Sequence, residues 1–314
     1  MSSWKVLIAD QLEAVAAELL SAHGVAVDAQ PTIEADALLE IIPDYHGLIV
    51  RGRTKPNAEM IQAASSLKVI GRAGVGVDNI DLAAAKSAGV AVVNTPQSTT
   101  LAVAEHAFAL LLALVRKIPQ ADTAVKAGEW PKRELLGTEL AGKTLGIVGV
   151  GKIGGLVARR AAAFEMRVLG YDPLLDEQAI RSRHAEPTAL DNLYAQSDVI
   201  SFHLPLTDET RGMVSGPAFI TMKSGVRIIQ TARGGVIDES ALLAALESGH
   251  VASAALDVFG QEPPGDIPLI RHPNVIATPH IAAQTAEAQS RAAHDVAEEI
   301  INALEGRPLR WQVA

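Results

Sequence analysis

The chain has 314 residues, of which 48% are hydrophobic and 20% charged, and its net charge is −9. This length favours two domains of ordinary size, and the composition is typical of a globular protein. The acidic balance argues against nucleic acid or an anionic membrane as a partner. The absence of cysteine excludes disulfides and thiolate chemistry. The N-terminus lacks a signal-peptide core and the most apolar segment, Leu101–Val115, is too short for a bilayer, so we expect a cytoplasmic protein.

Short apolar segments alternate with helical ones through the first third of the chain. Strands are predicted at Val6–Ala9, Val25–Val27, Gly47–Val50, Leu67–Gly71 and Val90–Val93, and helices at Leu12–His23, Ala35–Ile42, Ala58–Ala64 and Ile80–Ser87. Such alternation predicts a parallel sheet with helices on both faces. A helix over Thr100–Lys117 follows and is apolar nearly all round, so we expect it to be buried, either between domains or, as we favour, at a subunit interface.

A dinucleotide-binding fingerprint follows that helix. The apolar strand Leu145–Val148 runs into Gly149-Val-Gly151-Lys-Ile-Gly154, a helical pattern comes next, and a second strand pattern ends at Asp172. The first glycine permits the turn, the second lets a pyrophosphate approach the backbone, and the third lets the helix pack on the strand. The helix N-terminus attracts the phosphates.

Asp172 predicts which dinucleotide binds. Its carboxylate can accept hydrogen bonds from the adenosine ribose, whereas its charge would repel a 2′-phosphate. The expected cofactor is therefore NAD rather than NADP.

The remaining pattern completes a second α/β domain. Strands are predicted at Val199–His203, Val226–Gln230, Ala254–Val258 and Val275–Ala277, and helices at Asp238–Glu247 and Gln284–Leu304. We expect the last helix to pack back on the N-terminal domain. The prediction is an α/β fold of two Rossmann-like, doubly wound parallel-sheet domains, 1–98 plus 284–314 for substrate and 99–283 for NAD, with a cleft between them.

Several motifs, in order, resemble the D-isomer-specific 2-hydroxyacid dehydrogenase family, and within it the phosphoglycerate dehydrogenases most closely. They are Gly71–Asp81, Asn94–Pro96, Gly149–Gly154, Thr231–Asp238, Ala255–Phe259, Glu262–Pro264 and Pro279–Ile281. The resemblance implies hydride transfer between NAD and a small D-2-hydroxy or 2-keto acid. It also implies a homodimer joined through the nucleotide domain and the 100–117 helix. Because the chain ends at Ala314, we expect no C-terminal serine-sensing domain, and we expect no metal.

The family's catalytic residues map onto Arg233, Glu262 and His280. The imidazole of His280 would exchange the hydroxyl proton, a task that suits imidazole as a chemical group because it gains and loses a proton near neutral pH. Glu262 would hydrogen-bond the other ring nitrogen of His280 and raise the proton affinity of that imidazole. Arg233 would grip a carboxylate or carbonyl oxygen with its planar fork. Two other histidines, His106 and His203, are expected to be structural.

Further cofactor and substrate contacts follow from the resemblance. Lys152 and Ile153 would cover the pyrophosphate, Thr231 and Ala232 would line the nicotinamide pocket, and Asp257 would meet the carboxamide. The turn Gly74-Val75-Gly76 would present backbone N–H groups to the substrate carboxylate. Leu204 stands where the phosphoglycerate enzymes often have threonine, so we do not expect the polar contact which that hydroxyl makes near the cofactor. Val75 also replaces a hydroxyl residue that is common in those enzymes.

Substrate choice depends on cations for a distal phosphate. The candidates are Arg51, Arg72, Lys132 and Arg133, and lysine at 132 would bind a phosphate without the bidentate fork of arginine. A sulfonate or plain carboxylate would be electrostatically similar. The alternatives are therefore a hydroxypyruvate or glyoxylate reductase and a sulfolactate or D-lactate dehydrogenase. An NAD-sensing corepressor is a remote alternative from another functional class.

Overall fold

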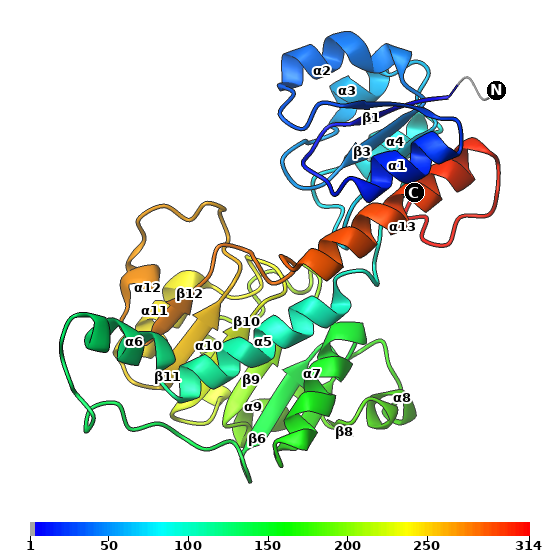
Figure 1. The fold of residues 1–314 in the computed structure, drawn as a ribbon. Helices are drawn as coiled ribbons and strands as arrows, with labels where there is room; N and C mark the ends of the chain where they lie inside the picture. Colours follow the sequence, from blue (N-terminus) through cyan, green and yellow to red (C-terminus); the bar gives the residue numbers. More distant parts are fainter. Residues whose placement is uncertain (1–3) are drawn as a thin grey trace. The chain divides into compact units, whose positions relative to one another are not determined.

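The computed structural model describes residues 4–314. These residues form two compact units, one made of the chain up to Thr100 together with Ala283–Ala314 and the other of Leu101–Ala282 (Figure 1). We call them unit 1 and unit 2. Each is built on a wholly parallel sheet, of five strands in unit 1 and seven in unit 2. The predicted class, two Rossmann-like α/β domains, is confirmed.

The sheet of unit 1 has the strand order β2-β1-β3-β4-β5. Its strands are β1 (Lys5–Ile8), β2 (Ala26–Ala29), β3 (Gly47–Val50), β4 (Val69–Arg72) and β5 (Ala91–Val93). Because side chains alternate along a strand, Val6 and Ile8 enter one core while Leu7 enters the other. Helices therefore cover both faces of the sheet.

The helices of unit 1 divide between the two faces. α1 and α13 pack on one core, and α2, α3 and α4 pack on the other (Figure 1). Their bounds are α1 (Val15–Ala22), α2 (Ala35–Ile41), α3 (Ala58–Ala63), α4 (Leu82–Ser87) and α13 (Ala286–Leu304), with a 3₁₀ turn at Ile42–Asp44. The predicted helix began at Gln284, whereas α13 begins at Ala286. Thr285 is its N-cap, because the hydroxyl of Thr285 accepts a hydrogen bond from the Ala288 N–H.

The C-terminal tail is fastened to unit 1 by a buried carboxylate. Glu299 of α13 is 0% exposed and accepts hydrogen bonds from the Arg310 N–H (2.9 Å) and the Arg310 side chain (2.8 Å). Gln312 then pairs with Val93 of β5. The last helix and the residues after it thus belong to the same core as β1.

The sheet of unit 2 has the order β12-β11-β10-β9-β6-β7-β8. Its strands are β6 (Thr144–Val148), β7 (Arg167–Tyr171), β8 (Glu186–Pro187), β9 (Val199–Phe202), β10 (Val226–Gln230), β11 (Val251–Leu256) and β12 (Val275–Ala277). Its helices are α5 (Thr100–Val115), α6 (Ile118–Lys126), α7 (Lys152–Ala163), α8 (Glu177–Ser182), α9 (Leu190–Gln196), α10 (Gly216–Thr221), α11 (Glu239–Glu247) and α12 (Pro268–Arg271). The short elements β8, α8, α9, α10 and α12 were not predicted.

The predicted helix Thr100–Lys117 corresponds to α5, and a second helix, α6, which was not predicted, follows it. α5 ends at Val115, Lys117 adopts a left-handed backbone (φ 52°), and α6 begins at Ile118. Phe108, Leu111 and other apolar residues of α5 are buried against the sheet of their own unit (Figure 1). The apolar character of α5 is therefore explained within one chain. Among residues 4–314, no helix combines the length and hydropathy needed to cross a bilayer.

Candidate active site

The glycine turn after β6 has the geometry that a dinucleotide requires. Gly149 has φ 91°, and a Cβ there would lie 2.5 Å from the carbonyl oxygen of His203. A Cβ on Gly154 would lie 2.1 Å from the carbonyl oxygen of Gly149. A Cβ on Gly151 would meet nothing within 4 Å. The protein's own packing thus accounts for the first and third glycines, whereas the space at Gly151 suits a pyrophosphate approaching the backbone.

Asp172 lies at the end of β7, next to that turn. Its Oδ2 accepts the N–H of Val150 at 3.0 Å, and its Oδ1 accepts the N–H of Leu174 at 3.0 Å. Each carboxylate oxygen can accept a second hydrogen bond, so the ribose role predicted for Asp172 remains chemically possible. Lys152 and Ile153 begin α7 beside the same turn. The residues present therefore fit NAD.

A hydrogen-bonded imidazole and carboxylate lie in unit 2. Nδ1 of His280 is 2.7 Å from Oε2 of Glu262. The other oxygen, Oε1, accepts the N–H of Phe259 at 3.1 Å, which fixes the orientation of the carboxylate. Since Nδ1 is engaged, Nε2 is the ring nitrogen left to exchange a proton with a substrate. The structure thus brings together two of the three predicted catalytic residues.

The backbone of His280 is held in an uncommon conformation. Its φ is 53°, in the left-handed region that a residue with a Cβ rarely adopts. Asp257, which is 0% exposed, accepts the N–H groups of Ile281 (2.9 Å) and Ala282 (2.8 Å) and the hydroxyl of Thr278 (2.6 Å). These bonds fasten the segment on both sides of His280. Asp257, predicted to contact the carboxamide, anchors the loop that carries His280 in this structure.

The charge on Asp257 is kept by its hydrogen bonds. Burial alone would raise the pKa of this carboxyl, but the hydrogen bonds from His106, Thr278 and the two backbone N–H groups lower the pKa below its usual value. Nε2 of His106 lies 3.2 Å from Oγ1 of Thr278 and 3.4 Å from Oδ1 of Asp257. Sequence reasoning missed this support for the loop, since His106 and Thr278 are far apart along the chain.

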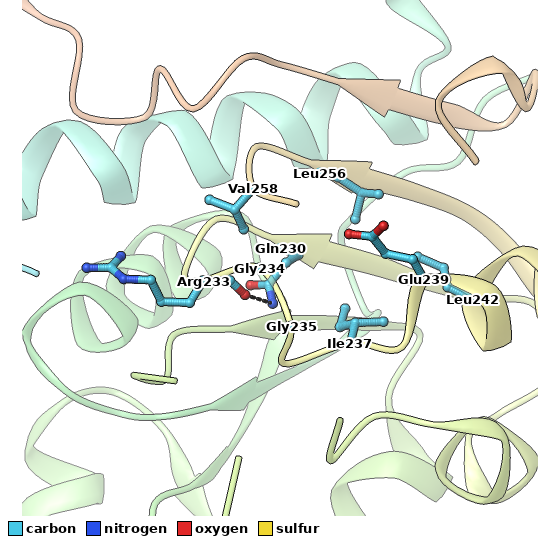
Figure 2. Close-up of a pocket in the computed structure, with 9 residues that line it drawn as sticks. All are labelled: Gln230, Arg233, Gly234, Gly235, Ile237, Glu239, Leu242, Leu256 and Val258. Carbon is cyan, nitrogen blue, oxygen red and sulfur yellow. Dashed lines mark hydrogen bonds between the residues drawn. The ribbon is translucent and has the colours of Figure 1, made fainter. Parts of the chain in front are cut away.

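Arg233 lies in a turn after β10 that is held by hydrogen bonds to the side chain of Gln230. The amide of Gln230 accepts the Ala232 N–H at 3.0 Å and donates to the carbonyl of Arg233 at 3.1 Å. A small pocket lies next to the turn, and Arg233 is one of the residues that line it. Figure 2 shows the Arg233 guanidinium pointing away from the other side chains that line this pocket. A Cβ on Gly234 would lie 1.7 Å from the carbonyl oxygen of Phe259. The Arg233 turn therefore packs directly on the loop that carries Glu262.

The other predicted contacts of unit 2 have varied surroundings. Thr231 is buried, and its hydroxyl is without a partner among the described residues. Leu204 packs close to Gly149. Lys132 and Arg133 lie on an exposed loop after α6. Burial lowers the pKa of His203 to about 4, so this histidine is neutral, and Nε2 lies 2.8 Å from the Ser201 hydroxyl.

Unit 1 gathers guanidinium groups at the carboxyl ends of its strands. Arg72 donates from Nε to the carbonyl of Arg51 at 3.1 Å. A Cβ on Gly74 would lie 1.5 Å from Nη1 of Arg72, so this guanidinium lies against the Gly74-Val75-Gly76 turn. Asn94 holds the turn by donating to the carbonyl of Val75 at 2.6 Å. Arg72 and the turn, both predicted to bind substrate, are neighbours.

A buried carboxylate orders the loop next to that turn. Asp10 is 4% exposed and accepts the N–H of Arg51 (2.6 Å) and the hydroxyl of Thr54 (2.6 Å). Arg53, which the sequence analysis did not single out, lies 3.5 Å from the same carboxylate. The Arg51 guanidinium donates to the neutral amide of Gln284. Burial lowers the pKa of Arg51, against the opposing charges of Asp10 and Glu13.

Comparison with known proteins gives a consistent set of relatives. Residues 108–282 match the family model described as the D-isomer-specific 2-hydroxyacid dehydrogenase, NAD-binding domain. A D-3-phosphoglycerate dehydrogenase of Archaeoglobus fulgidus is 46% identical, covering 98% of this chain and 58% of the relative. The chain thus spans little more than half the length of that relative.

Solved structures resemble the whole chain. A glyoxylate reductase from Paecilomyes thermophila has a TM-score of 0.91 and 36% identity, covering 100% of this chain and 99% of that one. A D-lactate dehydrogenase from Aquifex aeolicus, complexed with NAD and lactic acid, has a TM-score of 0.84 and 30% identity, with 96% of each chain covered.

The three glycines of the turn should respond differently to a methyl group. We expect Gly151→Ala to leave the melting temperature unchanged, because the Cβ enters open space, and to weaken NAD binding at least about tenfold by keeping the pyrophosphate away. Gly154→Ala is the matched control and should destabilise unit 2 by about 1–3 kcal/mol through overpacking. Calorimetry of unfolding and of NAD binding measures both. If Gly151→Ala bound NAD as tightly as the wild-type protein, the assignment of this turn to the cofactor site would be wrong.

Proposed function

The chain belongs to the D-isomer-specific 2-hydroxyacid dehydrogenase family, and from this premise we propose that it is an NAD-dependent oxidoreductase for a small D-2-hydroxy acid. The observation that carries the proposal is the 2.7 Å hydrogen bond between His280 and Glu262, on a loop fixed by a buried aspartate. An oriented imidazole backed by a carboxylate is the group that can take a hydroxyl proton at neutral pH.

Each residue of unit 2 has one task in this reaction. Nε2 of His280 takes the hydroxyl proton in oxidation and returns it to the keto oxygen in reduction. Glu262 accepts from Nδ1, so it stabilises the imidazolium that forms. Arg233 orients a carboxylate or carbonyl oxygen through its planar donor fork. Bound NAD supplies the hydride acceptor, and Gly151, Lys152, Ile153 and Asp172 are the residues that would hold it, with Thr231, Ala232 and Asp257 at its nicotinamide end.

Substituting the imidazole separates chemistry from binding. We expect His280→Asn to lower kcat by about 10²–10⁴-fold, because the proton acceptor is lost, while NAD affinity stays within about twofold. His294→Asn on α13 is the matched control and should keep full activity. Steady-state kinetics and calorimetric titration with NAD provide the two readouts. If His280→Asn turned over normally, the imidazole would have no part in the mechanism.

We further propose that the distal group of the substrate is a phosphate, as in a D-3-phosphoglycerate dehydrogenase. The support is the position of Arg51 and Arg72 at the carboxyl ends of neighbouring strands of unit 1, with Arg53 on the same loop as Arg51. The Arg51 guanidinium donates to the neutral amide of Gln284 and, within residues 4–314, makes no direct hydrogen bond to a carboxylate. The N–H groups of the Gly74-Val75-Gly76 turn would receive the substrate carboxylate, and Lys132 and Arg133 are further candidates for the phosphate.

A shorter 2-keto acid is the second candidate substrate. The glyoxylate reductase that matches over 99% of its length supports it, as does Val75, which offers no hydroxyl at the turn. Initial rates with 3-phosphoglycerate, D-glycerate, D-lactate, 3-sulfolactate and glyoxylate would separate these substrates. Turnover of any of these substrates would also argue against the corepressor alternative, in which the chain only binds NAD.

Arg51 tests the distal phosphate directly. We expect Arg51→Met to lower kcat/KM for 3-phosphoglycerate by about 10–100-fold, the worth of a charged hydrogen bond, and to change kcat/KM for D-glycerate by less than about threefold. Lys55→Met, on the same loop and exposed, controls for the lost charge. An equal loss for both substrates would refute the phosphate assignment.

We propose a homodimer formed through unit 2. The support is a group of exposed apolar side chains on α6 and the loop after it: Ile118, Val125, Trp130 and Leu136 are 54%, 54%, 80% and 82% exposed. Large exposed apolar groups of this kind are typical of interaction surfaces.

Light scattering tests the dimer. The wild-type chain should have the mass of two copies. Trp130→Ser should raise the dimer dissociation constant at least about tenfold, because a tryptophan that becomes buried on association often contributes much of the binding energy of an interface. Ile220→Ser on α10, also 79% exposed, should not change it. A wild-type monomer at high concentration would disprove the assembly.

A further inference from the structure

Arg183 contacts the glycine turn from outside the dinucleotide fingerprint. It lies directly after α8, and its Nη1 donates to the carbonyl oxygen of Val150 at 2.5 Å. Val150 stands between Gly149 and Gly151. On the other side of this residue, Asp172 accepts the Val150 N–H at 3.0 Å. Both polar groups of the Val150 backbone are therefore held by side chains from other elements.

Gly155 makes room for this contact. A Cβ on Gly155 would lie 3.2–3.4 Å from the Cβ, Cγ and Cδ atoms of Arg183, so the aliphatic stem of the arginine covers the glycine. A glycine within a helix is less favourable than alanine, because it loses more backbone freedom on folding. The fingerprint itself requires only Gly149, Gly151 and Gly154. The fourth glycine is thus explained by the path of the Arg183 side chain over the first turn of α7.

The backbone around Arg183 is itself well fixed. The carboxylate of Asp176 caps α8 by accepting the Ala179 N–H at 2.7 Å. The Arg183 N–H bonds to the Ile180 carbonyl at 3.0 Å, His184 turns the chain with φ 64°, and Ala185 is buried. The guanidinium is consequently delivered to Val150 by an ordered segment, so little entropy is lost in making the bond.

We propose that Arg183 is a positioning residue for the cofactor: by holding the Val150 carbonyl it keeps the glycine turn in the conformation that receives the pyrophosphate. This inference rests on the dinucleotide binding proposed above. A turn that is ordered before binding loses less conformational freedom when the ligand arrives. The fixed guanidinium also places a positive charge close to the turn, where two phosphate charges would lie.

The test is NAD affinity, measured by calorimetric titration, together with KM and kcat. Arg183→Met keeps the stem over Gly155 but loses the donor, and it should weaken NAD binding and raise the KM for NAD about tenfold, with kcat within about twofold. Arg183→Lys, which restores one donor and the charge, should recover most of the affinity. Arg181→Met is the matched control: Arg181 is exposed on α8, pairs with Glu177, and carries the same charge.

A second variant reaches the same contact without changing Arg183. Gly155→Ala should displace the stem and weaken NAD binding in the same direction, while Gly216→Ala, at a glycine with open space around it and no left-handed backbone, serves as a packing control by melting temperature. Wild-type affinity in Arg183→Met, or an equal loss in Arg181→Met, would overturn the inference. If the folded wild-type protein bound no NAD, the proposed function would fail instead, so the two failures are distinguishable.

Discussion

The buried carboxylate of Asp257 is the interaction on which the catalytic arrangement depends. It is inaccessible to solvent, and it accepts hydrogen bonds from Thr278 and from the two backbone N–H groups that follow His280. A buried charge without such bonds would be strongly unfavourable. Because these bonds lower the pKa of Asp257, its contribution to stability is complete above the ordinary carboxyl pKa and is lost only as pH falls through the lower folded value. At neutral pH the charged carboxylate therefore keeps the loop, and with it the left-handed backbone of His280, in place.

A carboxylate that accepts backbone N–H groups also follows two other strands. Asp10 follows β1 and holds the loop that carries Arg51, and Asp172 follows β7 and holds the Val150 N–H of the glycine turn. In each case a carboxylate after a parallel strand accepts N–H groups from a neighbouring loop. Doubly wound sheets bind ligands at this edge, where loops must be ordered without a hydrophobic core of their own. Charge-assisted hydrogen bonds supply that order, since each is stronger than a bond between neutral groups.

Much of this architecture could be predicted from local sequence. The β6–α7 fingerprint was recognisable because each glycine and Asp172 has a fixed place relative to a strand, and the principal strands were recognisable because buried parallel strands are continuous apolar runs. The Glu262–His280 pair came from motif resemblance. The helix α6, which begins directly after the left-handed residue Lys117, was not predicted, because none of its residues is buried and a core-facing apolar pattern is the main signal by which a helix is recognised in a sequence. His106, Thr278 and Arg183 were missed for another reason: each acts through a contact with a residue distant in sequence, and spacing says nothing about such contacts.

The charge of the chain limits how an anionic substrate can be selected. A net charge of −9 repels both NAD and a phosphorylated acid at long range, and at physiological ionic strength such fields are screened beyond about 8 Å. Recognition of anions must therefore come from donors at contact distance. The candidate donors in unit 1 are guanidinium groups ordered by Asp10 and the backbone of Arg51, and those in unit 2 are the N–H groups of the glycine turn and the guanidinium of Arg233. Because contact interactions depend on geometry rather than on total charge, moving one loop by the length of a hydrogen bond would change substrate preference while the motifs remained intact.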